Sequence, residues 1–342
     1  MIPRRILLVR NDKLGDFMLA WPAIRLLKER LPATELSVLV PEYTRPIAEL
    51  CPWVDQVVLD PGGQQFADSV ALARRISVHH FDAAIALFST TRVGFALWYA
   101  RIPLRLAPAT KLAQLFYNRR LKQRRSRSEK PEYQYNLDLA VAYLQELGID
   151  PGPPLSGPYL HFPDTDTTPL AESLRHSMGL DAQQRLIFVH PGSGGSANNL
   201  TLEQYSALCR ELRSSNGHGI VITAGPGEES HAETLAQSLG KLPHYLLLPN
   251  GLADLARHLQ VADLFISGST GPLHLAGALD RPTAAFYPSH RSGSALRWQT
   301  VNQAQNRLAF VPPEGGDPQE VSRIDVTQAA TEISHHYLLN PV

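Results

Sequence analysis

The sequence predicts an α/β protein built from two doubly wound domains. Apolar runs of strand length alternate with longer amphipathic stretches, which is typical of parallel sheets covered by helices on both faces. The pattern is interrupted over residues 150–169, which contain six prolines and two glycines, and then starts again. A chain of 342 residues is also too long for one ordinary hydrophobic core.

The first half of the chain predicts a sheet with its own helices. Amphipathic segments over residues 17–30 and 67–78 are expected to be helices. Strands are expected at residues 6–9, 36–40, 56–59 and 83–87.

The second half repeats this organisation after the proline-rich segment. Strands are expected at residues 186–190, 219–223, 245–247, 264–267 and 283–287. Helices are expected at residues 201–216, 232–239, 252–261 and 272–279, with a last amphipathic segment at 325–338. We therefore expect domains over residues 1–155 and 156–324, and a C-terminal helix within 325–342 that packs back on the first domain.

Composition restricts the classes of partner. Lysine plus arginine equals aspartate plus glutamate at 32 each, so overall charge predicts no nucleic-acid partner. Two cysteines, Cys51 and Cys209, fit a reducing compartment. With no signal-peptide pattern and no apolar stretch near the roughly 18 residues that span a bilayer, we expect a cytoplasmic protein. A peripheral contact with the inner face of the membrane stays open.

The turn after the first strand concentrates charge. It reads RNDKLGD from Arg10 to Asp16, and it lacks both the GxGxxG and the GxxxxGK[ST] phosphate motifs. Asp16 has two interpretations, a helix N-cap or a general base in a cleft where neighbouring charges tune its proton affinity. An N-cap alone leaves the surrounding Arg10, Asp12 and Lys13 unexplained.

Two loops of the second half suit phosphate groups. HPGSGGSANN, from His190 to Asn199, places small residues after a strand, where the backbone can approach a ligand closely. Ser269, Thr270 and Gly271 precede a helix that starts at Pro272, and a helix N-terminus favours anions. Both loops follow strands of one sheet, so we expect a diphosphate between them, with His274 close by. The alternatives are a flexible loop and a capped helix with a solvated histidine.

The segment RRLKQRRSR, from Arg119 to Arg127, holds six basic residues and no acid. It is either a solvated face or a surface for phosphorylated lipid. Few aromatic residues accompany it, which disfavours nucleic acid. No HExxH and no paired CxxC occurs, and the sequence predicts no metal site and no cofactor.

Three stretches together carry a resemblance to a known family. RNDKLGDFMLAWPAIRLLK, HPGSGGSANN and STGPLHLAGALDRPTAAFYPS, in that order and spacing, resemble glycosyltransferase family 9, the heptosyltransferases of lipopolysaccharide core assembly. The segment KPEYQYNLDLAVAYLQELGI and the GPGEE turn extend the resemblance over nearly the whole chain.

The resemblance implies two Rossmann-like domains facing each other across a cleft in the GT-B arrangement. It implies inverting transfer of a heptose from ADP-heptose to a lipid-anchored anionic saccharide of the inner core, without a metal, and with Asp16 as general base. The first domain then holds the acceptor and the second the donor. Expected acceptor-binding residues are Arg10, Lys13, Arg119, Arg120, Lys122 and Arg124. Expected donor-binding residues are His190, Gly192, Ser193, Gly194, Asn198, Ser269, Thr270, Gly271 and His274.

Two positions depart from the family pattern. Asn198-Asn199 stands where many members carry a lysine that meets the diphosphate, and Ser269 stands where many carry aspartate. A lost lysine removes a charge that stabilises the leaving group. The alternatives are therefore a transferase or epimerase that uses another nucleotide sugar, or a catalytically impaired relative that binds one.

Overall fold

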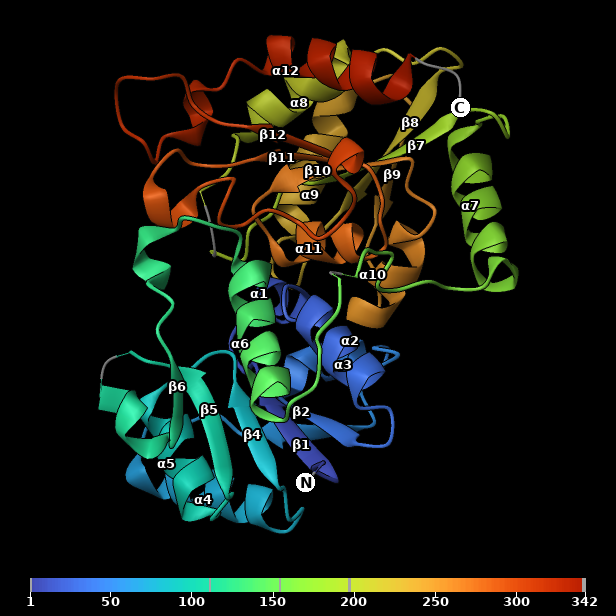
Figure 1. Ribbon diagram of the computed structural model, residues 1–342. Coiled ribbons are helices and arrows are strands. Elements are labelled where there is room, and N and C mark those ends of the chain that lie inside the picture. The colour runs from blue at the N-terminus through green and yellow to red at the C-terminus, as the bar shows by residue number, and fades with distance from the viewer. Residues whose placement is uncertain (1, 111, 154, 196–197, 340–342) are drawn as a thin grey trace. The chain divides into compact units, whose positions relative to one another are not determined.

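The computed structural model describes residues 2–110, 112–153, 155–195 and 198–339. The chain divides into two compact units, Met1–Ser156 and Gly157–Val342. Each unit contains its own sheet and its own helices (Figure 1). The division lies one residue from the predicted domain boundary.

The first unit contains a six-stranded parallel sheet in the order β3-β2-β1-β4-β5-β6. Its strands are β1 (Arg5–Val9), β2 (Glu35–Pro41), β3 (Gln56–Asp60), β4 (Ala83–Ala86), β5 (Leu104–Pro108) and β6 (Arg119–Leu121). The chain starts at the centre, runs outward to β3 and returns to β4 beside β1. The carboxyl ends of β1 and β4 therefore lie where the strand order reverses, the usual ligand site of such sheets.

Helices cover both faces of this sheet. Leu7 and Val9 pack with side chains of α4 and α5 in one buried cluster, and the alternation along β1 turns Ile6 and Leu8 to the opposite face. The helices of this unit are α1 (Leu14–Met18), α2 (Trp21–Arg30), α3 (Arg45–Ala48), α4 (Phe66–Ser77), α5 (Thr91–Tyr99) and α6 (Glu132–Glu146). Three 3₁₀ turns join them: η1 (Glu42–Thr44), η2 (Leu112–Phe116) and η3 (Arg125–Arg127).

The predicted helix over residues 17–30 is two helices, α1 and α2. Pro22 explains the break, because proline has no N–H for the carbonyl of Met18 and its ring clashes with that turn. The structure places Met18 at the end of α1 and Pro22 in the first turn of α2.

The second unit contains another six-stranded parallel sheet, in the order β12-β11-β10-β7-β8-β9. Its strands are β7 (Arg185–His190), β8 (His218–Thr223), β9 (His244–Leu247), β10 (Leu264–Gly268), β11 (Thr283–Phe286) and β12 (Arg307–Phe310). The strand order reverses between β7 and β10. The doubly wound α/β fold predicted for both halves is thus confirmed.

The helices of the second unit also lie on two faces. They are α7 (Asp164–Met178), α8 (Leu202–Glu211), α9 (Glu229–Leu239), α10 (Leu252–Leu259), α11 (Gly271–Ala278) and α12 (Val326–Ile333), followed by the π turn η7 (Ser334–Leu338). Ala330 and Ile333 of α12 are fully buried in the same core cluster as Leu208 of α8. The C-terminal helix, placed outside the second domain from the sequence, is thus part of that domain's core. Its contact with the first domain stays a prediction.

Several elements were not predicted individually. Strands β5 and β6 contain arginines, which obscure an apolar run, and α7 begins inside the proline-rich segment with Pro169 in its second turn. Among the described residues, none of the helices combines the length and the apolar character that crossing a membrane requires.

Candidate functional site

Arg10 organises the carboxyl edge of the first sheet. It directly follows β1, only 3% of its surface is exposed, and its guanidinium contacts three carboxylates. Nε donates to Asp12 at 3.0 Å, Nη1 lies 3.2 Å from Oε1 of Glu132, and Nη2 donates to Oδ1 of Asp16. Burial lowers the pKa of Arg10, but the three carboxylates outweigh burial and raise it, so Arg10 stays charged.

Asp16 lies in the first turn of α1, and the structure excludes the N-cap interpretation. The N-cap is Lys13, and its side chain makes no capping hydrogen bond. Oδ1 of Asp16 is bound by Arg10, and the Asp16 side chain is 15% exposed. The orientation of the side chain is therefore fixed while solvent still reaches it. This combination of orientation and access is what a general base needs.

Glu132, Asn136 and Arg125 complete this centre from distant parts of the sequence. Oδ1 of Asn136 accepts from Arg10 at 3.1 Å and from Arg125 at 3.2 Å, and its Nδ2 donates to the Leu19 carbonyl at 2.9 Å. Arg125 also lies 3.1 Å from Glu132. No sequence pattern indicated these partners, apart from the family-like segment that contains Glu132. We name this set of six side chains the Arg10 network: Arg10, Asp12, Asp16, Arg125, Glu132 and Asn136.

Asp12 has a raised proton affinity. Burial raises the pKa of Asp12 to about 6, Arg10 opposes that rise, and the negative charge on Asp16 adds to it. One carboxylate of the network therefore titrates close to neutral pH, where a change in its charge alters the field at Asp16.

A second buried carboxylate lies at the end of β3. Asp60 accepts hydrogen bonds from Asn11 and from Arg92, and from the backbone N–H of Gly62 at 2.9 Å. Asn11 belongs to the same charged turn as Asp16, so Asp60 fixes the far side of that turn. This role accounts for Asn11, which no sequence pattern explained.

The basic segment Arg119–Arg127 does not act as one surface. Arg119 pairs with Glu146, and Arg125 belongs to the Arg10 network. Arg120, Lys122 and Arg124 are exposed, as is Lys13. Of the predicted acceptor residues, Arg10 is the one whose geometry favours holding Asp16 over touching an acceptor directly.

The two predicted phosphate loops do lie side by side in the second unit. His190 at the end of β7 pairs in register with Ser267 of β10, so the loops that follow both strands leave from the same edge. Asn199 lies against Gly268, where an added Cβ would come 2.6 Å from its Oδ1. Asn199 also donates to the Pro191 carbonyl at 2.8 Å. Residues 196–197 of this loop lie outside the described residues.

Backbone N–H groups of this edge hold an anion, the Glu228 carboxylate. It accepts from Gly194 at 2.6 Å and from Gly225 at 3.1 Å. A Cβ at Gly192 would lie 2.1 Å from this carboxylate, so a larger residue there would require the Glu228 side chain to move. Burial would raise the pKa of Glu228, but the surrounding N–H groups and His190 outweigh burial and lower it. Glu228 is a site residue that the sequence analysis missed, although it lies in the GPGEE turn.

His190 is buried. Its Nδ1 lies 3.0 Å from Oγ1 of Thr223 and its Nε2 lies 3.5 Å from Glu228. Burial lowers the pKa of His190 against the opposing effect of Glu228. His190 therefore supports Glu228 and the loop from below the surface.

The start of α11 has the predicted geometry. Thr270 is its N-cap and accepts from the Leu273 N–H at 3.4 Å, and Ser269 and Gly271 are partly exposed beside it. His274 is 3% exposed, and burial lowers its pKa to about 4. This burial rules out a solvated histidine. The Nδ1 atom of His274 has no hydrogen-bond partner among the described residues, so it is a buried polar atom that a ligand could satisfy.

The remaining donor residues differ in exposure. Ser193 is partly exposed, and Asn198 is exposed and donates to the Gln319 carbonyl at 2.8 Å. Asn198 is therefore tied to the loop before α12.

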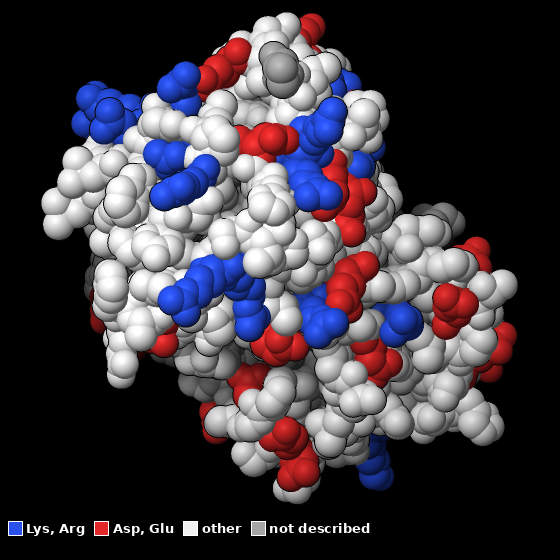
Figure 2. All heavy atoms as spheres, turned by 90° about the horizontal axis from the view of Figure 1, so that it is seen from below, with Lys and Arg blue, Asp and Glu red and all other residues white. Residues whose placement is uncertain are grey.

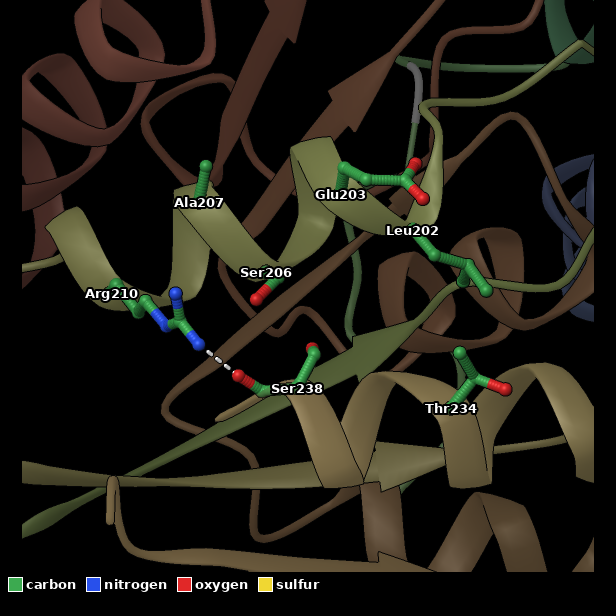
Figure 3. A pocket seen from close by; sticks show the side chains of 7 residues that line it. All are labelled: Leu202, Glu203, Ser206, Ala207, Arg210, Thr234 and Ser238. Atoms are coloured by element: carbon green, nitrogen blue, oxygen red, sulfur yellow. Dashed lines mark hydrogen bonds between the residues drawn. The ribbon is translucent and has the colours of Figure 1, made fainter. Parts of the chain in front are cut away.

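A pocket between α8 and α9 contains none of these residues (Figure 3). Arg210 bridges the two helices by donating to the Ser238 carbonyl. Within the described ranges, no group of three His, Cys, Asp or Glu could hold a metal ion.

Known proteins are similar to most of this chain. The model of glycosyltransferase family 9 (heptosyltransferase) matches residues 69–310. A Haemophilus influenzae protein named "Putative glycosyltransferase" is 44% identical over 335 residues, which cover 96% of each chain. Lipopolysaccharide heptosyltransferase 2 of Salmonella typhimurium is 21% identical over 296 residues, covering 83% of this chain and 82% of its own.

Solved structures share the fold. A family 9 glycosyl transferase from Veillonella parvula superposes with a TM-score of 0.78 at 16% identity, covering 98% of this chain and 97% of its own. The E. coli heptosyltransferase WaaC with ADP gives a TM-score of 0.72 at 20% identity, covering 97% of this chain and 99% of its own. The chain belongs to glycosyltransferase family 9 and is a heptosyltransferase-like glycosyltransferase.

Proposed function

We propose that this protein transfers a heptose from ADP-heptose to the inner core of lipopolysaccharide, with inversion, without a metal, and with Asp16 as general base. The observation that carries the proposal is the Asp16 carboxylate, which is oriented by a buried arginine yet open to solvent. A carboxylate in that state accepts a proton without first having to change its position.

The reaction needs one base and one anion site. Asp16 takes the proton from an acceptor hydroxyl, and the hydroxyl oxygen forms a bond to the anomeric carbon on the face opposite the diphosphate. The bond from that carbon to the diphosphate oxygen breaks, and ADP leaves with the electron pair. Backbone N–H groups and the N-terminus of α11 stabilise the charge that develops on the leaving group.

The donor site is proposed at the carboxyl edge of the second sheet. The N-terminus of α11 suits phosphate oxygens, and the unpartnered Nδ1 of His274 lies near the start of this helix. The Glu228 carboxylate accepts from the Gly194 N–H and thereby fixes the neighbouring loop. ADP-heptose is the donor we favour, because named relatives are heptosyltransferases and one was solved with ADP. Thr270 and Gly271 would then contact the diphosphate.

The acceptor is proposed to be a lipid-anchored anionic saccharide held by the first domain. Lys13, Arg120, Lys122 and Arg124 are exposed cations of that domain and suit phosphate and carboxylate groups. Such an acceptor places the enzyme in the cytoplasm, at the inner face of the membrane.

A panel of nucleotide sugars tests the donor. We expect ADP-heptose to raise the melting temperature more than UDP- and GDP-sugars do, because a ligand that binds the folded state stabilises it. The protein, ADP-heptose and a heptose-deficient core lipid are then incubated with EDTA. A lipid product heavier by one heptose would support metal-independent transfer. Stabilisation by another nucleotide sugar alone would favour the alternative donor, which Asn198 in place of lysine suggests.

A further inference from the structure

The first unit carries an exposed apolar surface that no part of the proposed reaction uses. It consists of side chains from the start of α4, the end of α5 and η2, and each of them is large and largely exposed. We name it the α5–η2 surface: Phe66 (72% exposed), Trp98 (51%), Tyr99 (49%), Leu112 (75%) and Leu115 (73%). Large exposed apolar groups that gather in this way mark interaction sites.

These side chains stand on a layer of packed rings. The Phe95 ring lies 5.2 Å from Phe66, 6.0 Å from Trp98 and 5.7 Å from Tyr99, measured between ring centroids. Phe116 of η2 lies 6.0 Å from Phe95 and 6.2 Å from Trp98. The rings of α4, α5 and η2 therefore form one packed layer, and the exposed Leu112 and Leu115 belong to the same turn η2 as Phe116.

The same stretch of chain is free of acidic residues. Residues 83–128 contain no Asp and no Glu, whereas the whole chain has 32 of them. This stretch spans α5, β5, η2, β6 and η3, and Arg101, Arg120, Lys122 and Arg124 in it are exposed. Its Lys and Arg residues are Arg92, Arg101, Arg105, Lys111, Arg119, Arg120, Lys122, Arg124, Arg125 and Arg127.

The space-filling view agrees with this distribution. Figure 2 looks from below onto the end of the first unit that carries α4 and α5 in Figure 1. Over its left part, separate blue groups are set in white, uncharged surface, and red groups are more frequent toward the centre and right. This face thus presents positive groups surrounded by residues without charge over part of its area.

We propose that the α5–η2 surface binds the bilayer itself, with its aromatic and leucine side chains in the headgroup region. The exposed basic residues of the stretch 83–128 would then contact anionic lipids. Tryptophan and tyrosine favour the membrane–water interface, and nearby basic residues attract anionic headgroups. A second copy of this chain fits less well, because two identical positive surfaces repel each other. The proposal rests on the proposed function only in that a lipid-anchored acceptor lies in the same bilayer.

Vesicle flotation of the full chain tests the proposal without donor or acceptor. The probe is a phosphatidylglycerol–phosphatidylethanolamine vesicle, compared with a phosphatidylcholine vesicle. We expect binding to the anionic vesicle that weakens with salt, and a blue shift of tryptophan fluorescence that Trp98→Phe removes. The double variant Leu112→Ser, Leu115→Ser should bind at least about tenfold more weakly, because neither serine inserts into the bilayer as leucine does.

A matched control removes exposed leucines elsewhere. Leu248→Ser with Leu296→Ser alters two exposed leucines of the second unit and should leave vesicle binding unchanged. Equal binding by the Leu112/Leu115 variant and the wild type would overturn the proposal, as would no binding at low salt. Dimers in solution that this variant dissociates would assign the surface to a second copy instead. Nucleotide-induced stabilisation, measured separately, reports on the proposed function and is independent of all these outcomes.

Discussion

The carboxyl edges of the two sheets have the same topology and opposite chemistry. The edge of the first sheet buries a charged arginine among three carboxylates, and two of these, Asp12 and Asp16, are partly exposed. The edge of the second sheet relies on backbone N–H groups and two buried histidines, with Glu228 as the anion that the N–H groups and His190 contact. A fixed carboxylate suits proton transfer, whereas oriented N–H groups suit binding of a diphosphate. One fold thus supports two different tasks, because the residues after each central strand differ.

The largest effect should come from removing the carboxylate of the first edge. Asp16→Asn keeps a hydrogen-bond acceptor for Arg10 but cannot take a proton, so turnover should fall by roughly a hundredfold or more. Nucleotide binding and melting temperature should change little, because the second edge is intact. Steady-state kinetics with the core lipid acceptor measure the loss. Near-normal turnover in a folded Asp16→Asn protein would remove the proton-transfer role from the first edge.

The exposed cations test whether the first edge also selects the acceptor. Arg120→Ser, Lys122→Ser and Arg124→Ser together should raise the acceptor KM by roughly a hundredfold at low salt, since each basic residue near an anionic surface contributes on the order of 1 kcal/mol before screening. The donor KM should stay the same, and the salt dependence of the acceptor KM should flatten. Arg210→Ser, Arg213→Ser and Lys241→Ser remove three exposed cations of the second unit as a control. Equal effects of the two triple variants would show that the segment Arg119–Arg127 is only a solvated surface.

The second edge is tested by blocking the start of α11. Gly271→Val places a branched side chain where the diphosphate is proposed to meet the backbone, and nucleotide affinity should fall by about tenfold. Gly271→Ala should cause a smaller loss, which makes the effect graded by size. Isothermal titration with ADP measures both variants. Full affinity in the folded valine variant would place the donor away from this edge.

We expect the buried and the exposed ion pair of α6 to differ in their effect on turnover. Glu132→Gln removes a buried charge beside Arg10, and turnover should fall by about fivefold, because a hydrogen bond between charged groups contributes around 1 kcal/mol more than its neutral counterpart. Glu146→Gln, on the same α6, breaks an exposed pair with Arg119 and should have no effect. Donor affinity should be normal in both. Equal turnover in the two variants would disprove the positioning role of Glu132.

The contrast between the edges also shows what sequence could predict. The loops of the second edge are local: glycines, hydroxyls and Pro272 stand next to one another, so their meeting at adjacent strands followed from the alternation of strands and helices. The first edge depends on long-range partners. Glu132 and Asn136 reach Arg10 across more than a hundred residues, and no local pattern predicts that contact. The sequence therefore indicated Asp16, but it predicted that Arg10 binds the acceptor. The structure instead favours a role of Arg10 in holding the Asp16 side chain.

The smallest effect concerns pH and separates the two aspartates of the first edge. Asp12 has a pKa raised to about 6, so it is neutral below that pH and ionised above it. Its negative charge favours proton transfer to the neighbouring Asp16, and turnover should therefore rise as pH passes about 6. Asp12→Asn resembles the protonated form at every pH, so this rise should vanish and turnover at neutral pH should fall about threefold. Turnover measured across this pH range for the variant, the wild type and the exposed control Asp181→Asn decides the matter. A rise near pH 6 that persists in Asp12→Asn would assign that titration to another group, and Asp12 would then serve only to hold Arg10.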